Sequence, residues 1–172
     1  MIESAMKNRL CLGIMLLLFA FSGCDLLTRY RLVSEEYGFS VEFPGKPTQQ
    51  SSKNYQGLPK SLWTLERGSA HGFFSAEATS YKEPLNPAPN WIPNREVLSS
   101  VQIQITDSRR FKLRAASGRE VLAIATTAKQ ARTGDLLSSI YIVDGRTLIS
   151  ITARTPNERR RAAFLDSLAL LR

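Results

Sequence analysis

The sequence contains few of the residues that most enzyme sites require. Its 172 residues include one histidine, His71, and two cysteines, Cys11 and Cys24. A Ser-His-Asp or Cys-His site needs a base that takes the proton of the nucleophile, and a zinc site needs several His or Cys ligands at close spacing. His71 lies beside a glycine in an expected turn, where a histidine is usually only solvated. We therefore expect no catalytic residue, no metal site, no cofactor and no enzymatic activity.

Phosphate-binding motifs are missing as well, because the chain has neither Gly-x-Gly-x-x-Gly nor Gly-Lys-Ser/Thr. Carboxylate-pair catalysis is the enzymatic route that the residue inventory leaves open. Glu42, Glu66 and Glu77 lie in expected strands and alternate with apolar residues, as solvent-facing side chains do. A small-molecule-binding or carboxylate-dependent hydrolytic domain is thus the alternative function, and a buried, convergent pair of acids would favour it.

Long apolar runs are also rare, and the sequence has one, at residues 10–21. Its length is that of the apolar region of a signal peptide and is short for a bilayer span. Lys7 and Arg9 precede it and supply the positive charge that holds this end on the cytoplasmic side. Translation from Met6 instead of Met1 would give the more usual start of such a segment.

The run ends in Ser22-Gly23-Cys24, which resembles a bacterial lipobox, although Phe21 stands where Leu is preferred. The resemblance implies cleavage before Cys24, a diacylglyceryl group on its thiol and acylation of its new amino group. Durable attachment needs at least two acyl chains, so this residue would anchor the protein to the membrane. The alternatives are an ordinary signal peptide with an incidental cysteine and a short transmembrane anchor. Asp25 favours the periplasmic face of the inner membrane, with the outer membrane as the alternative location in the bacterial envelope.

The remaining chain has the size of one domain. Removing residues 1–23 leaves 149 residues, enough for a single core. Residues 24–36 show no sustained period and predict a tether, so we place the domain at residues 37–172. Cys11 leaves with the signal peptide and Cys24 is acylated, which excludes disulfides.

Positive charge is concentrated in the second half. Residues 24–94 hold seven Lys and Arg against seven Asp and Glu, whereas residues 95–172 hold fourteen against seven. This excess suggests a surface for an anionic lipid or an acidic protein, with a merely solvated surface as the alternative. Nucleic acid is not expected, because an exported domain rarely meets it and the aromatic residues do not interleave with the basic ones. The candidate patch comprises Arg109, Arg110, Lys112, Arg114, Arg159, Arg160 and Arg161.

Alternating or β-branched segments predict strands at residues 37–43, 60–67, 73–81, 120–127, 136–143 and 146–154. Residues 48–56 are polar and predict a connection or a frayed strand. The proline-rich stretch 82–93 predicts extended surface backbone, in which Trp91 either anchors a ligand or closes the edge of a core.

Two helices are expected. In residues 94–107, Val97, Leu98, Val101 and Ile105 form one helical stripe, although residues 101–105 also alternate as a strand would. A second helix at residues 158–166 follows Asn157 as its cap, with Ala162 and Leu165 facing inward and residues 159–161 largely exposed.

The dipeptide Asp144-Gly145 predicts a type I′ hairpin that pairs Val143 with Arg146 and Ile140 with Ile149. This register places Ile140, Ile142, Ile149 and Ile151 on one face. The predicted core residues are Val41, Phe43, Leu62, Ile124, Ile140, Ile149 and Ile151.

Four short segments resemble PsbP-like proteins in sequence and order. They are residues 37–47, the tripeptide at 118–120, the hairpin around residues 144–145, and residues 164–168. Residues 115–117 depart from the aromatic–proline step often found in the family. The resemblance implies an α+β fold, a single α/β sandwich with a central antiparallel sheet flanked by helices. Members of this family are mostly binding or assembly proteins. We therefore expect a membrane-anchored envelope lipoprotein that acts as a non-catalytic binding or assembly module.

Overall fold

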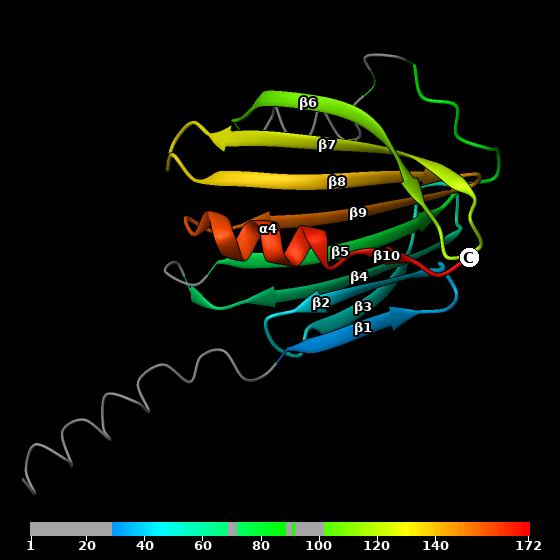
Figure 1. The fold of residues 1–172 in the computed structure, drawn as a ribbon, viewed down its shortest axis with the longest axis horizontal. Coiled ribbons are helices and arrows are strands. Elements are labelled where there is room, and N and C mark those ends of the chain that lie inside the picture. Colours follow the sequence, from blue (N-terminus) through cyan, green and yellow to red (C-terminus); the bar gives the residue numbers. More distant parts are fainter. Residues whose placement is uncertain (1–28, 69–71, 89–90, 92–101) are drawn as a thin grey trace, which may run out of the picture.

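The computed structural model describes residues 29–68, 72–88, 91 and 102–172. Its main feature is a seven-stranded antiparallel sheet in the order β3-β4-β5-β9-β8-β7-β6 (Figure 1). The strands are β3 (Thr48–Lys53), β4 (Pro59–Glu66), β5 (Phe73–Ser80), β6 (Ile103–Arg114), β7 (Glu120–Gln130), β8 (Leu136–Asp144) and β9 (Thr147–Arg154).

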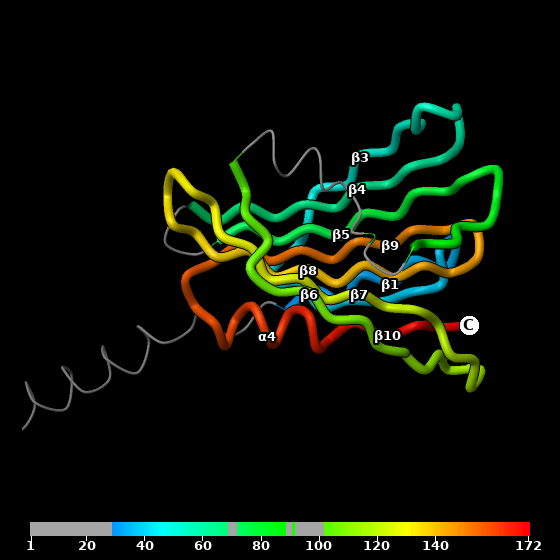
Figure 2. The backbone as a smooth tube through the Cα atoms, turned by 90° about the horizontal axis from the view of Figure 1, so that it is seen from above, coloured from blue at the N-terminus to red at the C-terminus, as the bar shows by residue number. Residues whose placement is uncertain are grey.

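A smaller layer covers one face of this sheet. It consists of a three-stranded antiparallel sheet, β1 (Tyr30–Ser34), β2 (Phe39–Phe43) and β10 (Ala169–Leu170), together with the helix α4 (Glu158–Asp166). The helix contacts β9, β2 and β8, and Figure 2 shows α4 and β10 on the same side of the large sheet. The fold is therefore a sheet-dominated α/β structure, in which a small sheet supplies much of the covering layer expected from helices.

The main core lies between these two layers. Its largest buried side chains come from alternate positions of the strands, as expected for a sheet face that packs on a second layer. Phe164 of α4 packs edge-on against Phe43 of β2 and Phe74 of β5, with ring centroids 5.0 and 5.2 Å away. These contacts join the helix, the small sheet and the large sheet. We call the covered face the inner face and the opposite one the outer face.

The outer face carries a second, smaller apolar cluster. Ile124 and Tyr141 are buried there with two neighbours from β8 and β9, and Tyr81, Leu85 and Trp91 pack against them. The connection after β5 thus covers part of the outer face. Trp91 closes the edge of a core, which is the second of the two roles that the sequence predicted for it. Ile124 is buried as predicted, but in this second cluster.

The helix predicted at residues 94–107 is wrong over its described part. Residues 103–107 belong to β6, which pairs with β7 over its length, with a register shift between Ile105 and Asp107. Long-range pairing of an alternating, β-branched segment outweighed the helical stripe. Residues 94–101 lie outside the described residues.

The tether predicted at residues 24–36 is also wrong in its second half. Residues 30–34 form β1, whose Leu32 and Ser34 are buried and which pairs with β2 from Tyr30↔Phe43 to Ser34↔Phe39. Pairing covers the edge of β2 that would otherwise be open, a long-range effect that local periodicity does not reveal. The fold therefore includes residues from about 30 onward.

The β8–β9 hairpin is confirmed, with a different register. Asp144 pairs with Thr147 and Ile142 with Ile149, so the two turn residues are Gly145 and Arg146. Gly145 has a φ of 59° and Arg146 has a negative one, the pattern of a type II′ turn with glycine in its first central position. Compared with the predicted register, each residue of β8 pairs with a residue two positions further along β9. The shift is an even number of residues, so the four isoleucines keep a common face.

Two predicted core residues are less buried than expected. Leu62 is half-buried because it points to the outer face, whereas its neighbour Trp63 points inward and is buried. Ile140 is half-buried and lies at the border of the main core. Val41, Phe43, Ile149 and Ile151 are buried as predicted.

Candidate functional site

The two ends of the sandwich differ in how the chain enters and turns. At one end β1 begins, β5 begins beside the end of β9 (Phe73↔Arg154), and α4 starts. We call it the tether end, and it comprises residues 29–31, 44–47, 66–68, 72–73, 129–136 and 154–160. The opposite end holds the β3–β4 and β8–β9 turns and the C-terminus, and we call it the hairpin end. In Figure 1 they lie at the left and right.

The structure divides the predicted basic patch between two places. Phe111 and Leu113 of β6 pack against the main core, so the alternating Arg110, Lys112 and Arg114 project from the outer face. The helix α4, which carries Arg159, Arg160 and Arg161, covers the inner face, and Arg109 lies on the same side of β6 as Phe111. The large sheet therefore lies between the three outer-face cations of β6 and the arginines of α4.

Arg109, Arg110 and Lys112 of β6 already interact with other groups of the fold. Arg110 donates to the carbonyl oxygen of Ala88, and Lys112 pairs with Glu120 on β7 at 2.6 Å. This carboxylate raises the pKa of the Lys112 ammonium. The guanidinium of Arg109 lies over the ring of Phe111, 5.7 Å from its centroid. These interactions hold the edge strand and the covering connection, and they reduce the charge available to a partner.

The cap of α4 is as predicted, but the residues that the helix buries are not. The Asn157 side chain accepts a hydrogen bond from the backbone N–H of Arg160 at 3.1 Å. Arg161 is buried, with 7% of its surface exposed, and donates to the carbonyl oxygen of Thr155. Ala162, expected to face inward, is exposed, because the buried stripe runs through Arg161 and Phe164. A long arginine stem can cover apolar surface while its head reaches a carbonyl group.

Arg159 and Arg160 remain exposed, and they are part of a larger basic group at the tether end. Its other members come from five further segments of the chain and were not singled out by sequence reasoning. No local signal marks them, since only strand pairing brings them to one end. They are Arg29, Arg31, Lys46, Arg67, Lys129, Arg132 and Arg154.

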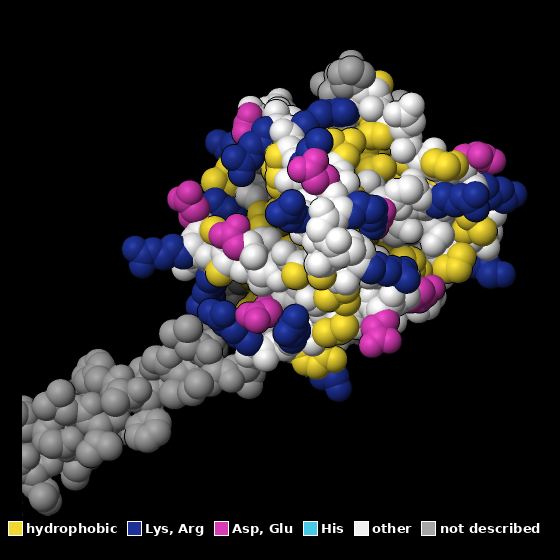
Figure 3. Space-filling model, turned by 45° about the vertical axis from the view of Figure 1, so that its right-hand side comes forward, with side chains coloured by type: hydrophobic (Ala, Val, Ile, Leu, Met, Phe, Trp, Pro, Cys, Tyr) yellow, Lys and Arg dark blue, Asp and Glu magenta, His cyan; other side chains and the backbone are white. Residues whose placement is uncertain are grey.

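Acidic residues are fewer at this end. They are Glu42, beside Tyr30 and Phe43, and Glu66, Asp135 and Glu158. Arg29 pairs with Glu42 at 3.2 Å, and the Arg29 side chain remains two-thirds exposed. Figure 3 shows Lys and Arg side chains along the left of the molecule, with a few Asp and Glu among them. The tether end is thus a positively charged surface.

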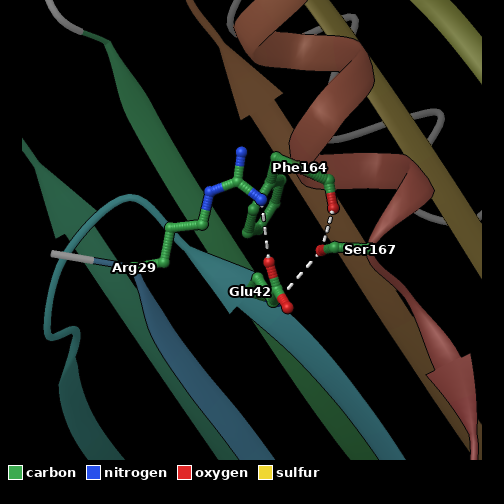
Figure 4. A network of polar contacts seen from close by, with 4 residues as sticks. All are labelled: Arg29, Glu42, Phe164 and Ser167. Carbon is green, nitrogen blue, oxygen red and sulfur yellow. Dashed lines mark hydrogen bonds and ion pairs between the residues drawn. The ribbon is translucent and has the colours of Figure 1, made fainter. Parts of the chain in front are cut away.

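A polar network ties the start of the described chain to the end of α4 (Figure 4). Besides the ion pair from Arg29 to Glu42, the backbone N–H of Glu42 donates to Ser167 Oγ at 2.9 Å. This hydroxyl in turn donates to the carbonyl oxygen of Phe164 at 2.6 Å. The residue at which the chain enters the fold is therefore fixed relative to the helix and the core.

Opposite charges are paired more closely at the hairpin end. Arg119 contacts both carboxylate oxygens of Asp144, at 2.6 and 2.9 Å, and also donates to the carbonyl oxygen of Arg172. Hydrogen bonding to this guanidinium lowers the pKa of the Asp144 carboxyl. Lys60 pairs with Glu77 at 3.1 Å.

The three carboxylates considered for hydrolysis do not converge. Glu42 lies in the small sheet, whereas Glu66 and Glu77 lie on the outer face of the large sheet. Glu66 pairs with Phe73 and Glu77 with Leu62, four residues apart along each strand, a separation of about 13 Å. None of the three is buried. Among residues 29–68, 72–88, 91 and 102–172, no group of three or more His, Cys, Asp or Glu could hold a metal ion.

No helix in the described part of the chain is long and apolar enough to cross a membrane. Comparison with known proteins gives structural neighbours only, because no family model matches the chain and no curated protein does. The solution structure of cyanobacterial PsbP (CyanoP) from Synechocystis sp. PCC 6803 is similar at a TM-score of 0.49 and 11% identity, over 86% of this chain and 95% of that one. A hypothetical protein from Listeria monocytogenes EGD-e is similar at a TM-score of 0.20 and 14% identity, over 73% of this chain and 98% of that one.

Proposed function

We propose that this protein is a bacterial envelope lipoprotein, anchored through acyl chains on Cys24, whose domain is a non-catalytic binding or assembly module at the membrane surface. In this proposal residues 1–23 are a signal peptide, and Asp25 places the protein at the periplasmic face of the inner membrane. The sequence motifs also lead us to propose that the domain is PsbP-like.

The position of β1 is the observation that carries the proposal. The fold begins at Tyr30, six residues after Cys24, and six residues span at most about 20 Å. An acylated Cys24 would therefore hold the tether end close to the bilayer and restrict how the domain can turn. Such a short connection suits a module that works at the membrane surface.

The arrangement of charged side chains also favours a binding role over a hydrolytic one. The described carboxylates that could have formed a catalytic pair are separate and accessible to solvent. The two carboxyl groups of a catalytic acid pair must lie close together, and the surroundings of at least one of them must raise its pKa. The basic side chains of the tether end instead lie together on an exposed surface.

The two cysteines provide a matched test of the anchor. Cells expressing the wild type, Cys24→Ala or Cys11→Ala are labelled metabolically with an alkyne fatty acid, and the purified proteins are weighed intact. The wild type and Cys11→Ala should carry the label and the mass of a chain that starts at Cys24. Cys24→Ala should remain an unlabelled precursor, because the lipid attachment requires that thiol. A wild-type protein without acyl chains would overturn the proposal.

A further inference from the structure

We infer that the tether end is a docking surface for anionic lipid headgroups, which holds the sandwich end-on with the hairpin end pointing away from the bilayer. The inference rests on the proposed function, since the acyl chains bring this surface to the membrane. It goes further by naming the surface, the ligand and the orientation.

The first support is the convergence of positive charge from separate parts of the fold. Arg31 comes from β1, Lys46 from the β2–β3 connection, Arg132 from the β7–β8 turn and Arg159 from α4, and all four are exposed. Arg67, Lys129, Arg154 and Arg160 add to them at the same end. Acidic side chains are fewer here, so the end keeps a net positive charge.

The second support is distance. Screening in physiological salt confines the attraction between a cation and a charged surface to about 8 Å, so only side chains very near the bilayer contribute. With Tyr30 at most about 20 Å from Cys24, the tether end is the part of the domain that the anchor holds nearest to this zone. Hairpin-end cations lie a strand length further away, about 25 Å for an eight-residue strand such as β4.

The third support is the kind of surface. The cations are carried mostly by turns, strand ends and the first turn of a helix, at scattered positions with no fixed spacing. Lipid headgroups diffuse laterally and can gather under such a set, whereas an acidic protein needs charges at matching positions. Each basic side chain near an anionic surface shifts the equilibrium by about fivefold, so several of them suffice to orient an anchored domain.

The test uses the full-length protein in nanodiscs of phosphatidylcholine alone or with phosphatidylglycerol. Hydrogen exchange is followed in the tether-end turn at residues 131–135 and in the hairpin-end turn at residues 54–57. We expect anionic lipid to slow exchange in the first turn by about fivefold or more and to leave the second unchanged. High salt should abolish the difference.

Two matched triple variants give the controls. Lys46→Glu with Arg132→Glu and Arg159→Glu removes three exposed cations from the tether end and should abolish the protection. Lys53→Glu with Lys82→Glu and Arg146→Glu makes the same charge change with exposed residues outside the tether end and should keep it. All six side chains are exposed, so both proteins should remain folded.

Several outcomes would overturn the inference. Exchange that is indifferent to lipid charge and salt, or equal effects of the two triple variants, would exclude lipid docking by this surface. Protection found in native membranes but not in anionic nanodiscs, and lost in the tether-end variant, would assign the surface to a protein partner instead. The intact mass of the same samples reports acylation of Cys24 separately. Failure of the anchor and failure of docking are therefore distinguishable.

Discussion

The tether end and the hairpin end both carry many cations, but they arrange them differently. At the hairpin end Arg119, in the β6–β7 connection, makes two hydrogen bonds to Asp144 at the end of β8, and Lys60 of β4 pairs with Glu77 of β5. At the tether end the cations lie mostly on turns and on the first turn of α4. Arg119 and Lys60 thus lie next to carboxylates, whereas Lys46, Arg132 and Arg159 of the tether end are exposed at the surface. The comparison shows that the surface charge of each end depends on which acidic residues the fold places beside its cations.

Two glycines, one at each end, differ in the space around them. A Cβ at Gly72, at the tether end, would lie 2.5 Å from Thr155 Cβ and 2.7 Å from the carbonyl oxygen of Arg154. A Cβ at Gly145, at the hairpin end, would meet nothing within 4 Å. The backbone at Gly72 is therefore closely packed against residues 154 and 155, so the same substitution should cost more at Gly72 than at Gly145.

The largest expected loss comes from α4, the helix that begins at the tether end and covers the inner face. Phe164→Ala removes a ring in contact with Phe43 and Phe74 and should lower the free energy of unfolding by about 3–5 kcal/mol, as measured by urea unfolding. Leu165→Ala, at a half-buried neighbouring position, should cost clearly less. Equal losses would mean that α4 does not pack through Phe164.

Gly72 and Gly145 should differ in how well they tolerate a side chain. Gly72→Ala combines a φ of 99° with a clash against backbone and should cost about 2–4 kcal/mol. Gly145→Ala has a φ of 59° and open space, so it should cost about 1–2 kcal/mol. Thermal unfolding of both variants, measured together, checks the order. A larger loss at Gly145 would contradict the packing difference.

The cap of α4 gives a smaller effect at the tether end. Asn157→Ala removes the acceptor of the Arg160 N–H and should cost about 1 kcal/mol. Asn157→Asp keeps an acceptor and should retain most of the stability in urea unfolding. If Asp behaved like Ala, the side chain would not be acting as the cap.

The smallest effect concerns acid sensitivity at the hairpin end. Because the folded-state pKa of Asp144 is lowered, its contribution is present above the unfolded pKa of about 3.9 and is lost as the pH falls through the folded value. Arg119→Met should remove up to about 1 kcal/mol at pH 6 and less at pH 3, because both side chains are partly accessible to solvent. Arg146→Met, on the adjacent turn, should leave the pH dependence as in the wild type. An Arg119→Met loss that is the same at pH 6 and pH 3 would contradict the role of this pair.

The sequence predicted the elements whose patterns are local. The strands β2, β4, β5, β7, β8 and β9 and the helix α4 with its Asn157 cap follow from alternation and from a capping residue. The lipobox at residues 22–24 is likewise local in sequence, and its acylation stays a prediction. Such features need no knowledge of distant parts of the chain.

Tertiary structure decided what depends on pairing between distant segments. β1 became a strand because β2 offered it an edge, and residues 103–107 joined β6 because β7 lies beside them. Arg161 was buried because its position on α4 shares a stripe with Phe164.

The basic surface is the clearest case. The sequence by itself determined that the chain is basic, and it placed the excess in the second half. The fold directed Arg110, Lys112 and Arg114 of β6 to the face of the large sheet opposite α4. It also brought Lys46, from the first half, to the same end as Arg159. Charge is a property of composition, but a charged surface depends on the order of strands in a sheet, which long-range pairing sets.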